Sequence, residues 1–270
     1  MKSRLRSVFL ATVVVASAAL LTSAVGVHAQ TWNSAGLAQS ALEPKKTPSG
    51  PAPKRDLTGI WDAGGAGVSG PGMKAAPLTP VGDALGKTHH SGNGTRMVPV
   101  TEINDPLSTL GDPAGFPRDL LFELRPFQVV QTPNQVLMLY MFEKRWRVIW
   151  TDGRALPKDP DPRWYGYSVG RWEDDNTFVV NTVGTDDRTW LDNAGNPHSS
   201  DLEVEERYRR VDRDTMELTV AIDDPKAYTR PWLGRDKLRL ALMPPDTDLM
   251  EMIPSASEAA EAKKIYAGEK

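Results

Sequence analysis

The chain has 270 residues and no cysteine, and its 32 basic and 35 acidic residues give a formal net charge of −3. This balance excludes the basic surface of a nucleic-acid-binding protein. The lack of cysteine excludes disulfides and thiolate metal sites, so the fold must depend on one well-buried core, for which the length is sufficient.

The N-terminus has the pattern of a secretory signal peptide. Lys2, Arg4 and Arg6 precede an apolar run up to Val25, and small residues for cleavage follow at Ala29. The alternative is a membrane anchor, since the run is just long enough to span a bilayer. We predict that residues 1–29 are removed, which leaves a periplasmic or secreted protein of charge about −6 with no integral membrane segment.

Two weakly patterned regions follow. Residues 30–55 alternate Pro with Lys, Ser and Gly, which predicts a flexible linker. Residues 64–99 hold most of the glycine surplus and predict a loop region. Within it, Thr79-Pro80 is typical of a helix start and predicts a short helix up to Gly86.

Short β-rich runs separated by turn residues fill the rest of the chain. Three of the connections are short and rich in Asp or Asn, which indicates hairpins. The predicted strands are Asp56–Asp62, Leu124–Thr132, Gln135–Phe142, Arg145–Thr151, Gly166–Glu173, Thr177–Gly184, Leu202–Val211, Thr215–Ile222, Lys237–Met243 and Asp248–Ile253.

Alternation along these runs indicates one dry and one wet face. Leu202, Val204 and Tyr208 point one way while charged neighbours point the other. Consecutive antiparallel strands with one buried face avoid open edges by closing. We therefore predict that residues 56–256 form an all-β, antiparallel up-and-down barrel of about 8–10 strands. The tail 257–270 is expected to form a short C-terminal helix.

Gly59-Ile60-Trp61 lies in the first predicted strand. It resembles the first-strand motif of the calycin superfamily, the lipocalins and their relatives. The resemblance implies a calycin-like barrel in which Trp61 packs across the closed end.

A wider set of motifs lies between about Gly111 and Met252. It is similar to the motifs of a large exported bacterial family whose members are mainly uncharacterised. The resemblance implies a shared fold and a shared site but no particular activity. Members often carry cysteines before the first motif and near the C-terminal strand, and this chain has none. The motifs are Gly115–Arg118, Pro126–Pro133, Trp150–Arg154, Gly166–Glu173, Asp187–Asp192, Pro197–Ser199 and Asp223–Trp232.

Polar and aromatic residues gather in the long loop Thr185–Ser199, between two predicted strands. Long loops at a barrel mouth often form binding sites. In an up-and-down barrel alternate connections share a rim, so we expect this loop to meet the segments Trp150–Arg154, Trp164–Tyr167 and Asp223–Trp232.

The residue types in these segments suggest roles. His198 is a candidate acid–base catalyst, oriented by Asp187 or else by Asp186, Asp192 or Asp201. Arg188 offers a fork for a carboxylate or an oxyanion. Flat rings and carboxylates would bind a ligand. The predicted ligand-binding residues are Trp190, Asp192, Tyr167, Asp223, Asp224, Tyr228 and Trp232.

Structural roles are the alternative for the same residues. His198 would bond within its turn, Arg188 would pair with neighbouring aspartates, and Trp190 would plug the barrel. Asp192 would shape a turn, and Asp223-Asp224-Pro225 would end a strand.

No cofactor or metal site is predicted. The adjacent His89 and His90 lack a further ligand at suitable spacing, and there is no Gly-x-Gly-x-x-Gly or Gly-x-Ser-x-Gly motif in a suitable context. The favoured function is binding of a small amphipathic, aromatic or sugar-like molecule at the rim. A hydrolase, lyase or isomerase using His198 is the first alternative, and an envelope interaction protein is the second. The oligomeric state stays open.

Overall fold

The computed structural model describes residues 49–68, 77–122, 124–253 and 255–267. The predicted signal peptide, most of the predicted linker and residues 69–76 of the glycine-rich region lie outside the described residues. In these ranges, no helix is long and apolar enough to cross a membrane.

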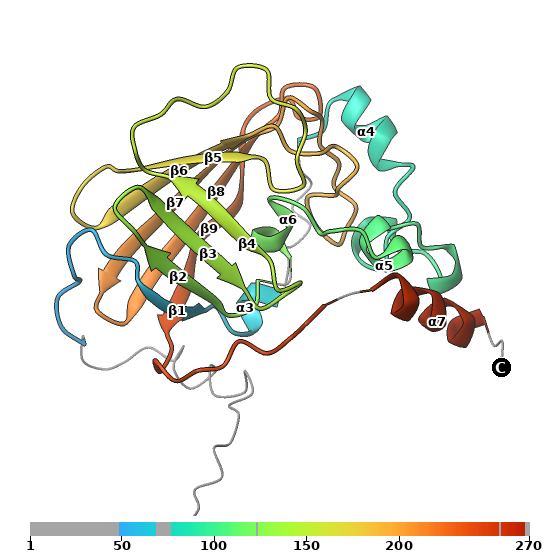
Figure 1. Ribbon diagram of the computed structural model, residues 1–270. Helices are drawn as coiled ribbons and strands as arrows, with labels where there is room; N and C mark the ends of the chain where they lie inside the picture. Colours follow the sequence, from blue (N-terminus) through green and yellow to red (C-terminus); the bar gives the residue numbers. More distant parts are fainter. Residues whose placement is uncertain (1–48, 69–76, 123, 254, 268–270) are drawn as a thin grey trace, which may run out of the picture. The chain divides into compact units, whose positions relative to one another are not determined.

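Nine strands form a closed barrel in chain order, and β1 pairs with β9 to complete it (Figure 1). This confirms the predicted all-β barrel and its strand number. The strands are β1 (Gly59–Asp62), β2 (Phe127–Gln131), β3 (Gln135–Tyr140), β4 (Trp146–Trp150), β5 (Tyr167–Trp172), β6 (Thr177–Val183), β7 (Glu203–Asp212), β8 (Thr215–Asp223) and β9 (Trp232–Leu242).

One neighbouring pair departs from the predicted up-and-down order. β4 and β5 are parallel, with Ile149 opposite Ser168, whereas all other pairs in the barrel are antiparallel. Their connection, residues 151–166, must therefore run from one end of the barrel to the other. We call it the crossover connection. The predicted last strand at Asp248–Ile253 is also wrong, because that segment makes only a single bridge, between Met252 and Phe142.

The strand directions define two rims. The upper rim carries the connections 141–145, 184–202 and 224–231, together with the start of β5. The lower rim carries the connections 132–134, 173–176 and 213–214. Trp150 ends β4 at the lower rim, where the Thr151 amide donates to the Asn134 carbonyl. The parallel pair therefore separates Trp150–Arg154 from the other predicted site segments.

Trp61 packs inside the barrel. Its side chain is fully buried, and its indole nitrogen donates to the carbonyl oxygen of Leu57 at 2.8 Å. The Arg210 guanidinium lies 4.6 Å from the centre of its ring. Gly59 is required beside it, because its φ is +139° and a Cβ there would lie 2.5 Å from the Leu242 side chain.

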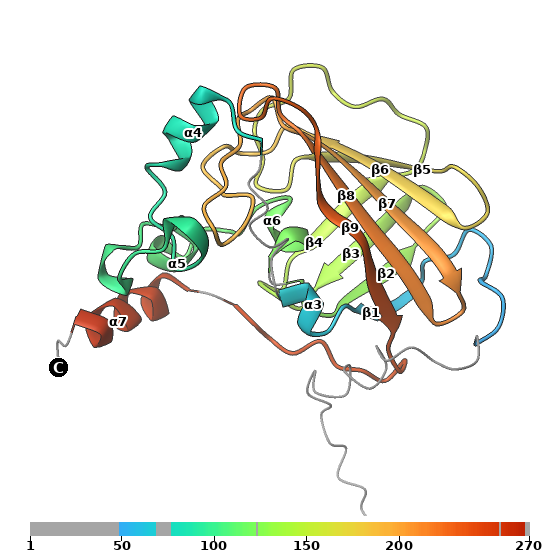
Figure 2. The same ribbon diagram turned by 180° about the vertical axis from the view of Figure 1, so that it is seen from behind.

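Helices and helical turns occupy the segments outside the strands. Thr79 caps α4 (Pro80–Gly86), as predicted, because its side chain accepts the Gly82 amide at 3.0 Å. α7 (Ala256–Ala267) confirms the predicted C-terminal helix and lies beside α5 (Pro106–Leu110) (Figure 2). They are α3 (Gly65–Val68), α4 (Pro80–Gly86), η2 (Gly94–Arg96), η3 (Val100–Glu102), α5 (Pro106–Leu110), α6 (Arg118–Leu121) and α7 (Ala256–Ala267).

Candidate functional site

The loop Thr185–Ser199 lies on the upper rim and meets the segment after β8, as predicted. Asp224 accepts the backbone amide of Ser199 at 2.6 Å and its hydroxyl at 2.8 Å. The Tyr228 hydroxyl donates to the Pro197 carbonyl at 2.6 Å. Asp224 is fully buried, so it ties the two connections together from inside the protein.

His198 is the predicted catalyst, and its side chain is only 1% exposed. Its Nε2 lies 2.8 Å from the Thr189 hydroxyl, and its Nδ1 lies 3.1 Å from the Ser199 carbonyl oxygen. Burial lowers the pKa of the imidazole. Both ring nitrogens therefore bond within the loop, and neither bonds to a carboxylate.

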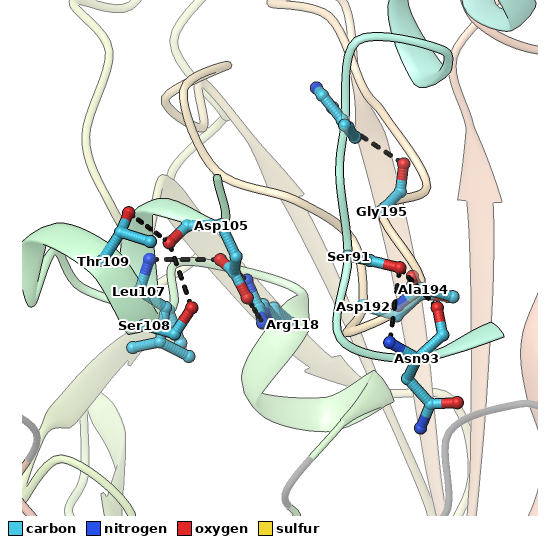
Figure 3. A network of polar contacts seen from close by, with 12 residues as sticks. Ser91, Asn93, Asp105, Leu107, Ser108, Thr109, Arg118, Asp192, Ala194 and Gly195 are labelled. Carbon is cyan, nitrogen blue, oxygen red and sulfur yellow. Dashed lines mark hydrogen bonds and ion pairs between the residues drawn. The ribbon is translucent and has the colours of Figure 1, made fainter. Parts of the chain in front are cut away.

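Trp190 contacts the segment that leads into η2 and η3, whereas Asp192 bonds within its own loop. Trp190 stacks on His89 with ring centres 4.6 Å apart. The Arg118 guanidinium lies 5.8 Å from the centre of the Trp190 ring. Asp192 accepts the Ala194 amide at 2.9 Å, which shapes the turn. Figure 3 shows the Ser91–Asn93 turn beside this loop, and the fork of Arg118 on Asp105.

Arg188 and Asp187 lie at the surface. The Arg188 fork donates to Asp186 at 2.6 Å and stacks 4.4 Å over the Trp164 ring. This pairing lowers the pKa of Asp186. The Arg188 side chain is 64% exposed, and Asp187 is exposed beside it. Neither residue contacts His198 through a hydrogen bond.

The three remaining predicted residues make no hydrogen bond to the His198 ring. Tyr167 starts β5 and is covered by the Arg163 guanidinium at 4.0 Å. Trp232 starts β9, with its ring centre 5.3 Å from that of Tyr228. Asp223 is exposed at the end of β8. The loop and the segment after β8 therefore meet as predicted, whereas Trp150–Arg154 does not join them, and the contacts are those of a well-packed loop scaffold.

A large groove lies on the outside of the same rim. We call it the crossover groove, because residues 156–162 of the crossover connection overhang it. Its volume is about 1200 Å³. The strand face beneath it is one cross-strand row, since Val169 pairs with Asn181, Asn181 with Glu205 and Glu205 with Ala221. Further lining residues are Pro157, Lys158, Asp159, Pro160, Val183, Thr185, Asp201, Glu203, Asp223 and Pro231.

Sequence reasoning missed a polar cluster in the barrel interior. Arg147 donates to Glu206 at 2.8 Å and to the Thr182 hydroxyl at 2.8 Å, and all three side chains are buried. The Tyr208 hydroxyl donates to Glu206 at 2.7 Å. Glu206 stands two residues from both Val204 and Tyr208 on β7, and alternate residues of a strand face the same side. The sequence alternation therefore indicates that Glu206 points into the barrel.

Asp119 of α6 completes this interior cluster. Its side chain is only 5% exposed, and neither carboxyl oxygen has a hydrogen-bond partner in the structure. Burial raises its pKa to about 8, with Glu206 and Glu143 adding to the rise and Arg147 opposing it. A buried carboxyl with so strongly raised a pKa is a candidate functional residue.

The described residues contain no group of three or more His, Cys, Asp or Glu able to hold a metal ion. No family model, curated protein or solved structure matches the chain. The resemblances noted in the sequence therefore stay predictions, and the functional argument depends on the site geometry.

Proposed function

We propose that the protein is an exported, calycin-like barrel that binds a small amphipathic organic molecule in the crossover groove. The observation that carries this proposal is the groove itself. It offers about 1200 Å³ on the predicted rim and combines apolar side chains, among them Val169, Val183 and Ala221, with several carboxylates. Concave sites with an apolar lining and a few polar groups are the usual places for small ligands.

Catalysis by His198 has less support. An acid–base residue must reach the proton that it transfers. The two ring nitrogens of His198 are bonded to Thr189 and Ser199, and the side chain is 1% exposed. Binding is therefore favoured over a hydrolase, lyase or isomerase activity at this residue.

The lining also narrows the ligand class. No aromatic ring lines the crossover groove in the described part of the chain, which gives no support to stacking on a sugar or aromatic ligand. Glu203 and Asp223 are register partners on β7 and β8, so two like charges face each other directly. Such pairs are destabilising. A cationic group seated between them would relieve the repulsion, which favours a ligand with an amine and an apolar body.

Three probes of one shape test this proposal. We expect 4-phenylbutylammonium to bind about tenfold more tightly than 4-phenylbutyrate, with 4-phenylbutanol between them, because only the cation gains from the carboxylates. Isothermal titration calorimetry on the chain without residues 1–29 measures the three affinities. Nuclear magnetic resonance shifts at Val169 and Ala221 locate the bound probe.

A double variant, Glu203→Gln with Asp223→Asn, should remove the preference for the cation. The matched control is Glu217→Gln, which neutralises a carboxylate nearer the other end of β8 and outside the lining. Equal affinities for the three probes, or a double variant that binds like the native chain, would contradict the proposal. Export itself is checked by N-terminal sequencing of the mature protein, with Gln30 expected first.

A further inference from the structure

Residues 114–122, which include α6, form a plug segment in the upper mouth of the barrel (Figure 1). Its apolar residues are almost completely buried, with Ala114 1% exposed and Phe116, Leu120 and Leu121 fully buried. The Phe116 ring lies 4.0 Å from the Arg147 guanidinium of β4. The plug segment therefore reaches the interior polar cluster.

Hydrogen bonds fix the plug segment at both ends. At its start, Glu143 accepts the Ala114 amide at 2.9 Å, and the Trp164 carbonyl accepts the Phe116 amide at 2.9 Å. At its end, Arg235 donates to the carbonyl oxygens of Leu120 at 3.1 Å and Leu121 at 2.9 Å. In the middle of the segment, the Arg118 guanidinium forms a buried fork on Asp105, with nitrogen–oxygen distances of 2.8 and 2.6 Å, whereas the neighbouring Asp119 side chain is held by packing alone.

The Asp119 side chain is buried in the plug segment, and neither of its carboxyl oxygens has a hydrogen-bond partner. The guanidinium that favours its ionised form is that of Arg147, which is already bonded to Glu206, Ser168 and Thr182. An ionised Asp119 would therefore add a further buried negative charge without gaining a hydrogen bond, which is costly. The charged and titratable groups that face it are Arg147, Glu206, Glu143, Tyr140 and Tyr165.

We propose that Asp119 is a proton-operated latch on the barrel mouth. With a neutral carboxyl, the plug segment stays seated. When the carboxyl loses its proton to solvent, the carboxylate moves toward water, the plug segment leaves the mouth and the interior opens. This device is separate from the crossover groove, which lies outside the barrel.

The direction of the switch follows from burial. Burial raises the pKa of Asp119 to about 8. The latch is therefore closed at neutral pH and opens in mildly alkaline solution. Between the ordinary aspartate pKa of about 4, expected in the open form, and the pKa of about 8 in the closed form, each pH unit favours the open form by about tenfold, because one proton is released on opening. Above about pH 8 the effect levels off.

The first test is a titration of the native chain. With carboxyl-¹³C aspartate, the Asp119 carbon is assigned by its loss in Asp119→Asn, and its chemical shift is followed from pH 5 to pH 10. We expect one titration close to pH 8. A titration below pH 6 would overturn the proposal. If Asp119→Asn does not fold, Asp119→Glu supplies the assignment.

The second test measures opening. Because the chain has no cysteine, Ala114→Cys places a single thiol inside the closed mouth. Its labelling rate by a maleimide is compared in the native, Asp119→Asn and Asp112→Asn backgrounds. The pH dependence of the thiol itself is common to all three and cancels in the ratios.

We expect the labelling rate of the native background, divided by that of Asp119→Asn, to rise by about thirtyfold between pH 6.5 and pH 8–9 and then to level off, because one proton is released on opening below the pKa of the closed form. Asp112→Asn should follow the native background, since both can ionise at position 119. Asp112 is the matched control because it is an acidic residue just outside the plug segment, where it is only half-buried. A ratio of native to Asp119→Asn labelling rates that stays constant from pH 6.5 to pH 9 would show that ionisation does not open the mouth.

Discussion

Arg147 and Glu206 form an ion pair inside the barrel, where their side chains are 2% and 0% exposed. A buried pair of this kind contributes little net stability, because desolvation offsets the attraction. Its members nevertheless depend on each other, since removing one leaves an uncompensated charge. The pair also sets the electrostatic environment of Asp119, whose burial next to it distinguishes this interior from an apolar core.

His198 shows how a reactive residue type can serve structure. Its ring joins Thr189 to the Ser199 backbone within the loop. We expect His198→Ala to lower the free energy of unfolding by about 2–4 kcal/mol, because it leaves a cavity and removes the ring's bonds to Thr189 and Ser199. Urea unfolding followed by tryptophan fluorescence measures the loss.

The matched control is His90→Ala, which changes an exposed histidine and should alter stability by less than about 0.5 kcal/mol. Probe binding in the crossover groove should stay within about twofold in both variants, because neither residue lines the groove. If His198→Ala kept full stability but lost binding or turnover, the structural role would be wrong.

At the scale of elements, the parallel β4–β5 pair decides where the ligand site lies. An antiparallel pair needs only a short turn, whereas a parallel pair needs a connection along the length of the strands. That connection passes outside β5 and β6 and creates the crossover groove. The same step takes Trp150–Arg154 away from the upper rim.

Gly170 allows β5 to pack closely in this region. A Cβ there would lie 2.3 Å from the Phe178 ring and 2.8 Å from the Ile149 side chain. We therefore expect Gly170→Ala to cost about 1–3 kcal/mol of stability through overpacking. Gly65→Ala is the control, because a Cβ at Gly65 meets nothing within 4 Å. Chemical denaturation of both variants measures the difference, and equal stabilities would show that β5 and β6 can separate without cost.

At the scale of the whole molecule, stability should depend on pH through Asp119. The pKa of this carboxyl is about 8 in the folded chain and about 3.9 in an unfolded one. The folded state therefore keeps a proton that the unfolded state loses. This contribution to stability is complete below about pH 4, falls by about 1.4 kcal/mol per pH unit as pH rises, and levels off above about pH 8.

The Asp119→Asn side chain cannot ionise. As pH rises from 5 to 8, the free energy of unfolding of the variant should therefore increase relative to that of the native chain. Urea unfolding of both proteins at each pH gives the difference directly, and contributions from other groups cancel in it. A difference that stays constant over this range would show that Asp119 has an ordinary pKa in the folded protein.

The sequence by itself determined the barrel. Alternating residues such as Leu202, Val204 and Tyr208 fix which face of a strand is dry, and Asp- or Asn-rich turns mark where strands reverse. Both signals depend only on residues that are close in the sequence, so they can be recognised without knowing which strands lie side by side in the fold. The same is true of Thr79 as a helix cap and of Asp192 as a turn former.

Only the tertiary structure decided the strand partners and the chemistry between them. A long connection such as 151–166 fits either a parallel or an antiparallel partner, so the sequence could not place Trp150 or reveal the crossover groove. Asp119 becomes unusual only because Glu206, Glu143 and the plug segment surround it from distant parts of the chain. Burial and electrostatics are sums over such neighbours, and residue order alone does not contain them.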